Sequence, residues 1–252
     1  MSTLQIIDHS TRVPPGLCAL GIMTKAPQPG KVKTRLVPPL TPEEAAQLNI
    51  CFLRDLSESI SRACTEVSAR GVAVFTPAES AEIYATILHP DFMAIPQRGE
   101  NFGDRLIFAV EDLFRAGFAS VCLINSDSPT VPASVFVTAV TELSRRPEQV
   151  VLGPAEDGGY YLIGMAWLQR RLFEDIDWST ERVFEQTRQR AEEIGSPIMK
   201  LPTGLDIDDR EALMRLCSQL LKNELAPNMN AAVETQKFLS ELVRKKKLMV
   251  AQ

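Results

Sequence analysis

The chain has 252 residues, of which 45% are hydrophobic and 23% are charged, and its net charge is −5. This length suffices for one large domain with a sizeable core, and the composition is that of a globular protein. The acidic balance argues against a nucleic-acid-binding protein, and no apolar run is long enough for a transmembrane helix. Five scattered cysteines and only two histidines offer neither zinc-ligand spacing nor a Ser-His-Asp triad, so we expect a cytoplasmic protein with reduced cysteines.

The first predicted strand, residues 17–23, leads into a basic loop. Lysine and arginine bind phosphate oxygens through charge-assisted hydrogen bonds, and prolines and a glycine stiffen this loop. We therefore favour a phosphate or pyrophosphate site here over an ordinary solvated loop. The loop has neither the Walker A pattern nor the Gly-x-Gly-x-x-Gly pattern. Between His9 and Pro42 there is no acidic residue, but there are five basic ones: Arg12, Lys25, Lys31, Lys33 and Arg35.

Alternating strands and helices follow. Thr41-Pro42-Glu43-Glu44 is a capping box, which predicts a helix from there to about Arg70. The alternation continues to residue 153, and it is typical of a mostly parallel, Rossmann-like sheet with helices on both faces. We thus expect a three-layer α/β/α sandwich. The predicted strands are 72–76, 92–95, 121–124 and 150–153, and the predicted helices are 81–88, 106–114 and 132–146.

The pattern changes after residue 153. A turn at 154–159 is too short for a helical crossover, so the strand predicted at 160–165 is expected to run antiparallel to its predecessor. Further predicted elements are a helix at 180–194, a strand at 198–201, and helices at 210–225 and 231–247.

An aspartate follows directly on the predicted strand 121–124, in the segment Asn125-Ser126-Asp127-Ser128-Pro129. Open α/β sheets bind ligands just beyond the carboxyl ends of their strands, so Asp127 is well placed to hold a divalent cation at a phosphate. A helix cap or an Asx turn explains the same residue equally well. The segment by itself does not decide between these two interpretations.

Two further acidic segments support the metal interpretation. In Asp206-Ile207-Asp208 the alternation of an extended chain puts both carboxylates on one side and Ile207 in the core. Carboxylates suit Mg²⁺ or Mn²⁺, which neutralises the charge of a nucleoside diphosphate. The second segment is the turn 156–160, whose Gly158 and Gly159 permit close approach of a ligand and whose Tyr160 could stack on a base or sugar. A tight hairpin turn with a core tyrosine is the alternative for this segment.

Together these segments resemble a family of bacterial GT-A-fold proteins described as nucleotide-diphospho-sugar transferases, which includes glycosyltransferases linked to arsenosugar biosynthesis. The resemblance covers residues 17 to about 215 and implies a GT-A sandwich that binds a nucleotide, as a nucleotide sugar, with a divalent metal. The motifs that carry it are 23–36, 125–129, 153–164, 178–180 and 206–208.

The resemblance also implies roles for individual residues. Pro129 stands where such glycosyltransferases usually have the second aspartate of Asp-x-Asp, so Asp127 must share its metal with residues distant in sequence. The implied metal ligands are Asp127 and Asp208 or Asp206; the implied diphosphate ligands are Lys25, Lys33 and Arg35; the implied acceptor or sugar side is Asp157, Gly158, Gly159 and Tyr160.

Three functions are compatible with these residues. A glycosyltransferase would use Asp157 or Glu156 to deprotonate the acceptor hydroxyl of a small molecule. A nucleotidylyltransferase resembling phospholactate guanylyltransferase would join a nucleoside triphosphate to a phosphorylated small molecule and release pyrophosphate. A non-catalytic nucleotide-binding protein would tolerate Asp157→Asn. We expect the first, a transferase that acts without nucleic acid or membrane.

Three parts are expected along the chain. Residues 1–15 are predicted to be a loose leader, and residues 16–225 a single GT-A-like nucleotide-binding domain. Residues 226–252 are predicted to add a C-terminal helix, which either packs on the domain or contributes to a homodimer contact.

Overall fold

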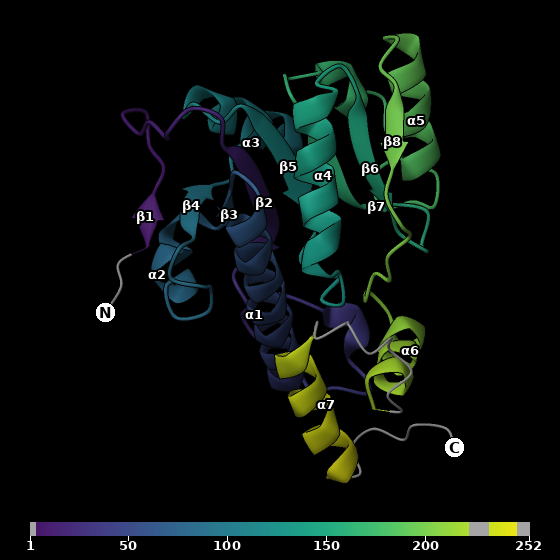
Figure 1. Ribbon diagram of the computed structural model, residues 1–252. Helices are drawn as coiled ribbons and strands as arrows, with labels where there is room; N and C mark the ends of the chain where they lie inside the picture. Colours follow the sequence, from purple (N-terminus) through teal and green to yellow (C-terminus); the bar gives the residue numbers. More distant parts are fainter. Residues whose placement is uncertain (1–3, 222–231, 246–252) are drawn as a thin grey trace.

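The computed structural model describes residues 4–221 and 232–245, and within them the centre of the fold is an eight-stranded sheet (Figure 1). The strand order is β1-β4-β3-β2-β5-β7-β6-β8. β7 pairs antiparallel with β5 and β6, whereas the other neighbours pair in parallel. The strands are β1 Gln5–Ile6, β2 Cys18–Lys25, β3 Ala69–Thr76, β4 Met93–Pro96, β5 Ser120–Ile124, β6 Val150–Pro154, β7 Tyr160–Met165 and β8 Ile198–Lys200.

Helices cover both faces of the sheet, which confirms the predicted three-layer α/β/α class. α1 and α4 pack on one face, and α3, η3 and α5 pack on the other. The α-helices are α1 Pro42–Glu66, α2 Ala81–Tyr84, α3 Phe102–Arg115, α4 Ala133–Arg145, α5 Val183–Glu193, α6 Arg210–Leu221 and α7 Val233–Arg244. The short 3₁₀ helices are η1 Thr34–Leu36, η2 Ala78–Ser80 and η3 Arg170–Phe173.

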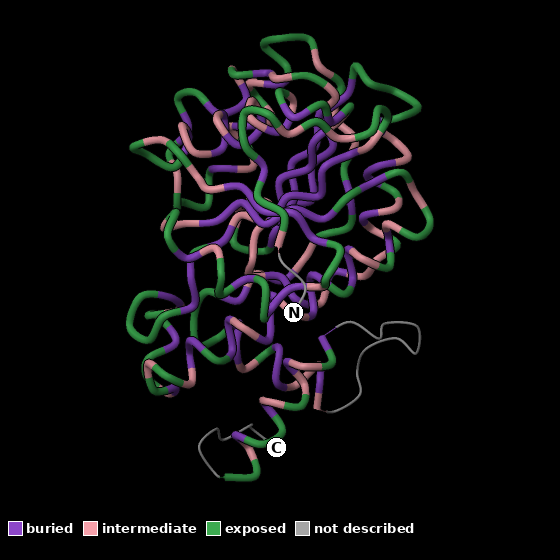
Figure 2. Tube along the Cα trace, turned by 90° about the vertical axis from the view of Figure 1, so that its left-hand side faces the viewer, coloured by how far each residue is buried: buried purple, intermediate pink, exposed green. Residues whose placement is uncertain are grey.

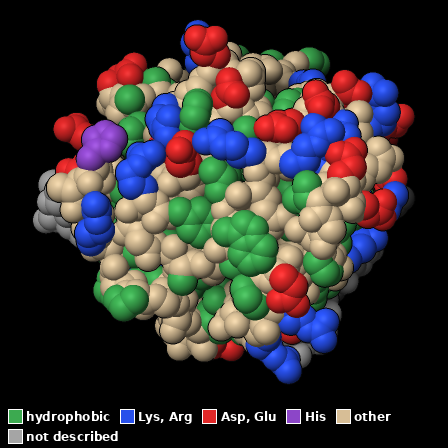
Figure 3. All heavy atoms as spheres, turned by 90° about the horizontal axis from the view of Figure 1, so that it is seen from above, with side chains coloured by type: hydrophobic (Ala, Val, Ile, Leu, Met, Phe, Trp, Pro, Cys, Tyr) green, Lys and Arg blue, Asp and Glu red, His purple; other side chains and the backbone are tan. Residues whose placement is uncertain are grey.

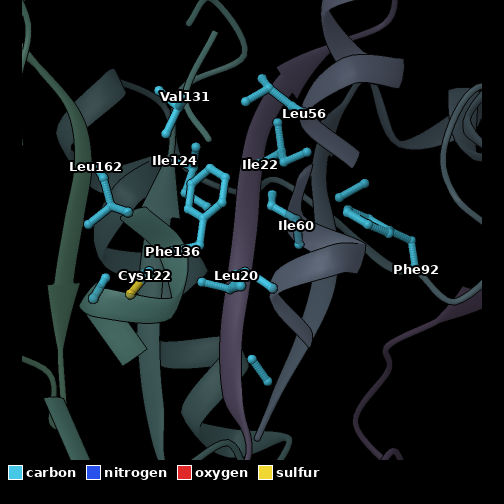
Figure 4. Packing of buried hydrophobic residues seen from close by; sticks show 14 of the residues in the cluster. Leu20, Ile22, Leu56, Ile60, Phe92, Cys122, Ile124, Val131, Phe136 and Leu162 are labelled. Carbon is cyan, nitrogen blue, oxygen red and sulfur yellow. The ribbon is translucent and has the colours of Figure 1, made fainter. Parts of the chain in front are cut away.

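Buried apolar side chains hold the layers together. The central strands form the most deeply buried part of the chain (Figure 2). Between α4 and the sheet, Phe136 lies against Ile124, and between α1 and the sheet, Ile22 lies near Leu56 and Leu20 lies near Ile60 (Figure 4). Each such side chain contributes about 1.5–3 kcal/mol when fully buried. This packing fixes the strand ends on which the site is built.

The long helix α1 begins as the sequence predicts and ends earlier. The Thr41 side chain accepts a hydrogen bond from the Glu44 backbone, and the Glu44 side chain accepts one from the Thr41 backbone, as in a capping box. The prediction that the helix continues to Arg70 is wrong, because it ends at Glu66. Residues 69–71 instead pair with Cys18–Leu20 and lengthen β3 at its start.

The C-terminal helices α6 and α7 pack at the end of α1 that lies away from β1 (Figure 1). Asp55 of α1 caps the first turn of α7: its carboxylate accepts hydrogen bonds from the backbone N–H groups of Glu234 and Thr235, at 2.8 Å each, and from the Thr235 hydroxyl at 2.6 Å. The described part of the C-terminal helix therefore packs on the domain. The expected boundary at residues 225–226 lies outside the described residues.

Part of the segment expected as a leader joins the sheet. Gln5 and Ile6 form β1, which pairs in parallel with β4, and Ile7 is 4% exposed. None of the helices in the described ranges has the length and apolarity needed to span a membrane. On the face seen from above, positive and negative side chains are interspersed around hydrophobic ones (Figure 3).

Candidate active site

A cavity of about 450 Å³ lies at the carboxyl ends of β2 and β5, beside the start of β7. The chain order reverses between β2 and β5, since β3 and β4 lie on one side and β7 and β6 on the other. Such a switch point is where open α/β sheets bind ligands. Its polar lining includes Arg35, Asn125, Asp127, Asp157, Thr180, Glu181, Asp206 and Asp208; its apolar lining includes Met23, Phe102, Leu106, Leu123, Ile163 and Trp178.

Three carboxylates meet on one wall of this cavity. Asp127, Asp206 and Asp208 each bring one oxygen within 4.8 Å of the others. The Ile207 backbone N–H donates to the Asp127 carbonyl at 3.0 Å, and this bond ties the two segments together. Ile207 is fully buried, as its place between the two aspartates predicts. Oxygen ligands close enough to share one ion suit Mg²⁺ or Mn²⁺, so the residues present fit a divalent cation.

Asp206 has a strongly perturbed pKa. Burial and the neighbouring charge of Asp127 raise the pKa of Asp206 from 3.8 to about 8. The Asn125 amide donates to this carboxylate at 3.4 Å. A buried carboxyl beside two others costs free energy to ionise, and a bound cation would remove that cost.

Lys33 lies against this cluster rather than in the cavity. Its ammonium is 2.8 Å from Asp127, 3.0 Å from Asp208, and donates to the Ile207 carbonyl at 2.7 Å. The side chain is 4% exposed and is absent from the cavity lining. Burial by itself lowers the pKa of Lys33, but the charges of Asp127 and Asp208 outweigh it and the pKa is raised overall. Lys33 is therefore charged and engaged with carboxylates.

The other basic residues of the loop are placed differently. Arg35 lines the cavity with its side chain 72% exposed, and its guanidinium lies 3.9 Å from Asp208. Lys25 ends β2 and is exposed, outside the cavity lining. Of the three predicted diphosphate ligands, Arg35 is thus the one whose side chain faces the cavity.

The turn between β6 and β7 forms part of the rim. Asp157 and Gly159 line the cavity, and the Gly159 backbone N–H donates to the Asp157 carboxylate at 3.0 Å. Glu156, the other predicted base, instead forms an ion pair with Arg215 on α6. Tyr160 also lines the cavity, and burial raises the pKa of its hydroxyl.

Gly158 connects this turn to the next wall. It has a φ of +88°, and a Cβ at this position would lie 2.2 Å from the Glu181 carbonyl oxygen. Its own carbonyl accepts a hydrogen bond from the Phe184 backbone N–H at 2.9 Å. The close approach that glycine permits here is to the protein's own segment 180–184.

An aromatic wall of the cavity has no counterpart in the predicted roles. The rings of Phe102 and Trp178 pack edge to face, with centroids 5.1 Å apart, and Phe102 is 48% exposed. Trp178 belongs to one of the motifs that carry the resemblance, but no role follows from the motif alone. Asn101 is the N-cap of α3, and its side chain accepts a hydrogen bond from the Asp104 backbone N–H. This cap places Phe102 at the first position of the helix, but it does not indicate that the ring lines a cavity.

Comparisons with known proteins agree with this geometry. Residues 59–180 match the model of a family described as "Uncharacterized protein conserved in bacteria (DUF2064)". A structure from Desulfovibrio desulfuricans G20, described as a putative nucleotide-diphospho-sugar transferase, is 28% identical with a TM-score of 0.79 over 90% of this chain and 95% of that one. The chain is similar to the nucleotide-diphospho-sugar transferases. The predicted resemblance is therefore confirmed.

More distant structures share the fold alone. A cytidylyltransferase from Leptospira borgpetersenii is 11% identical with a TM-score of 0.51, over 93% of this chain and 97% of that one. A 4-diphosphocytidyl-2C-methyl-D-erythritol synthase from Anaerococcus prevotii DSM 20548 is 10% identical with a TM-score of 0.51, over 81% and 96%. No curated protein matches the chain. The similar Desulfovibrio desulfuricans structure is described as a transferase, the class of enzyme that the sequence predicts for this chain.

Proposed function

We propose that this protein is a metal-dependent nucleotide-diphospho-sugar transferase that moves a sugar from a nucleotide sugar to a small acceptor. One observation carries the proposal: a single cavity joins the carboxylates of Asp127, Asp206 and Asp208 to the guanidinium of Arg35 and the carboxylate of Asp157. These groups are a cation site, a phosphate ligand and a base. The five free cysteines suit the reducing cytoplasm, where we place the reaction.

In this proposal, Asp127, Asp206 and Asp208 hold the Mg²⁺ or Mn²⁺. The ion supplies charge neutralisation for the diphosphate that departs with the nucleoside. Arg35 contacts the phosphates directly, because its exposed guanidinium already faces the cavity. Lys25, outside the cavity, adds positive charge at the end of β2.

Asp157 is the proposed base. It removes the proton from the acceptor hydroxyl as the acceptor oxygen bonds to the sugar carbon, while the bond from that carbon to the diphosphate breaks. Its carboxylate is exposed at the cavity and is held by the Gly159 N–H. Glu156 is less suited, because its carboxylate is engaged by Arg215.

A thermal-shift screen of nucleotide sugars and nucleoside triphosphates, each with and without Mn²⁺, tests this proposal. A ligand that binds the native state raises the melting temperature by mass action. We expect a larger, Mn²⁺-dependent rise with one nucleotide sugar than with any triphosphate. A larger rise with a triphosphate would favour nucleotidyl transfer, and the absence of any Mn²⁺-linked rise would contradict both enzymatic functions.

A further inference from the structure

The buried ammonium of Lys33 occupies a specific position relative to the acidic cluster. All three of its N–H donors have acceptors: one oxygen of Asp127, one oxygen of Asp208 and the Ile207 carbonyl. Asp127 and Asp208 line the cavity, whereas Lys33 does not. The lysine therefore approaches the two carboxylates from the protein interior.

The ammonium contacts the Oδ1 atom of each carboxylate, and at Asp208 the two oxygens have different partners. The Oδ1 atoms of Asp127 and Asp208 lie at the ammonium, at 2.8 Å and 3.0 Å. The Oδ2 atom of Asp208 faces Arg35, at 3.9 Å. A carboxylate has two oxygens, so a second partner on the cavity side can be bound while the first is kept.

The surroundings of Lys33 fix the ammonium in place. The side chain is 4% exposed, and the ring of Phe52 in α1 lies below it, with the centroid 5.7 Å from Nζ. A lysine that reached out to a phosphate would have to leave three acceptors and this buried position. Two exposed basic side chains of the same loop, Lys25 and Arg35, are free of that cost.

We propose that Lys33 is a positioning residue of the cation site: it holds Asp127 and Asp208 from behind and presents their outer oxygens, together with Asp206, to a divalent cation. It also balances one negative charge of the cluster. Lys33 is then not a ligand of the diphosphate. This inference rests on the proposed function, because it assumes that the cluster binds a metal.

Binding of Mn²⁺ alone, followed by electron paramagnetic resonance without nucleotide, tests this role. The loss of a group that orients a metal ligand typically weakens metal binding about 10- to 100-fold, and we expect a loss of this size in Lys33→Met. Lys33→Arg, which retains the charge and the donors, should recover part of the affinity. Lys31→Met is the matched control, since Lys31 is an exposed residue of the same loop, and its Mn²⁺ affinity should be unchanged.

Equal or tighter Mn²⁺ binding by Lys33→Met would overturn the inference and show that the lysine competes with the cation. No Mn²⁺ binding by the wild-type protein would instead contradict the cation site of the proposed function, and the role of Lys33 with it. A second measurement uses the wild-type protein only, in case Lys33→Met does not fold. Acetylation read by mass spectrometry should leave Lys33 unmodified with and without Mn²⁺ while Lys31 reacts; modification of Lys33 upon Mn²⁺ addition would overturn the inference.

Discussion

Replacing Asp206 with asparagine is expected to stabilise the metal-free protein and to abolish cation binding. Burial and the nearby charge of Asp127 raise the pKa of Asp206 to about 8, far above its value of 3.8 in an unfolded chain. Below pH 3.8 the carboxyl is protonated in both states and has no effect on stability. As the pH rises from 3.8 to 8, the unfolded state releases its proton first, so the folded state loses stability over this window.

The size of the effect follows from that window. Each pH unit is worth about 1.4 kcal/mol, so at pH 7 the loss reaches about 4 kcal/mol. An asparagine does not ionise and escapes this loss. We therefore expect the free energy of unfolding of Asp206→Asn to exceed that of the wild type by up to about 4 kcal/mol at pH 7, with the difference vanishing near pH 4.

Urea denaturation in EDTA at pH 4, 5.5 and 7 measures the difference, and Mn²⁺ titration measures the loss of binding. Glu148→Gln is the control, because Glu148 is exposed and far in sequence from the cluster, and it should show neither effect. A variant less stable than the wild type at pH 7, a difference independent of pH, or retained Mn²⁺ affinity would refute the reasoning.

Three further predictions concern other parts of the structure. Asp157→Asn should lower turnover about 100- to 10,000-fold while nucleotide-sugar affinity measured by calorimetry is retained; unchanged turnover would exclude this base. Gly158→Ala should lower the free energy of unfolding by more than about 2 kcal/mol, because the new Cβ clashes with segment 180–184 and the φ at this position is positive. Gly30→Ala is the control: Gly30 has a φ of +70° and open space around it, so this variant should lose only the smaller free energy that the positive φ costs. Asp55→Asn should lower it by about 1–2 kcal/mol in urea titrations, since one capping acceptor of α7 is lost; an unchanged value would show that the cap contributes nothing.

Local patterns were sufficient to predict most of the fold. The capping box at Thr41 places the start of α1, and the short turn before Tyr160 predicts the antiparallel β7. The end of α1 was missed because residues 69–71 have no strong local preference, and pairing with β2 decides their conformation. Likewise, β1 has two residues, and only its pairing with β4 makes it a strand.

The candidate site could also be predicted only in part, because some of its contacts join segments that are far apart in the sequence. Asp127, Asp206 and Asp208 each follow from their place at the end of an extended segment, and the structure brings them together. The buried position of Lys33 could not be predicted, because a lysine in a basic loop is expected to be exposed. Its partners Asp127 and Asp208 lie 94 and 175 residues away along the chain. The wall of Phe102 and Trp178 depends on the packing of α3 against segment 173–178, which carries no local pattern.

The products formed from a nucleotide sugar test the central claim most directly. The protein would be incubated with Mn²⁺, the nucleotide sugar that gives the largest thermal shift, and a pool of small hydroxyl-bearing acceptors. Mn²⁺ would then be removed, and phosphorus NMR would identify the nucleotide products. We predict that nucleoside diphosphate accumulates, and that Asp208→Asn abolishes the signal. Pyrophosphate released from a nucleoside triphosphate, with no diphosphate from any nucleotide sugar, would contradict glycosyl transfer.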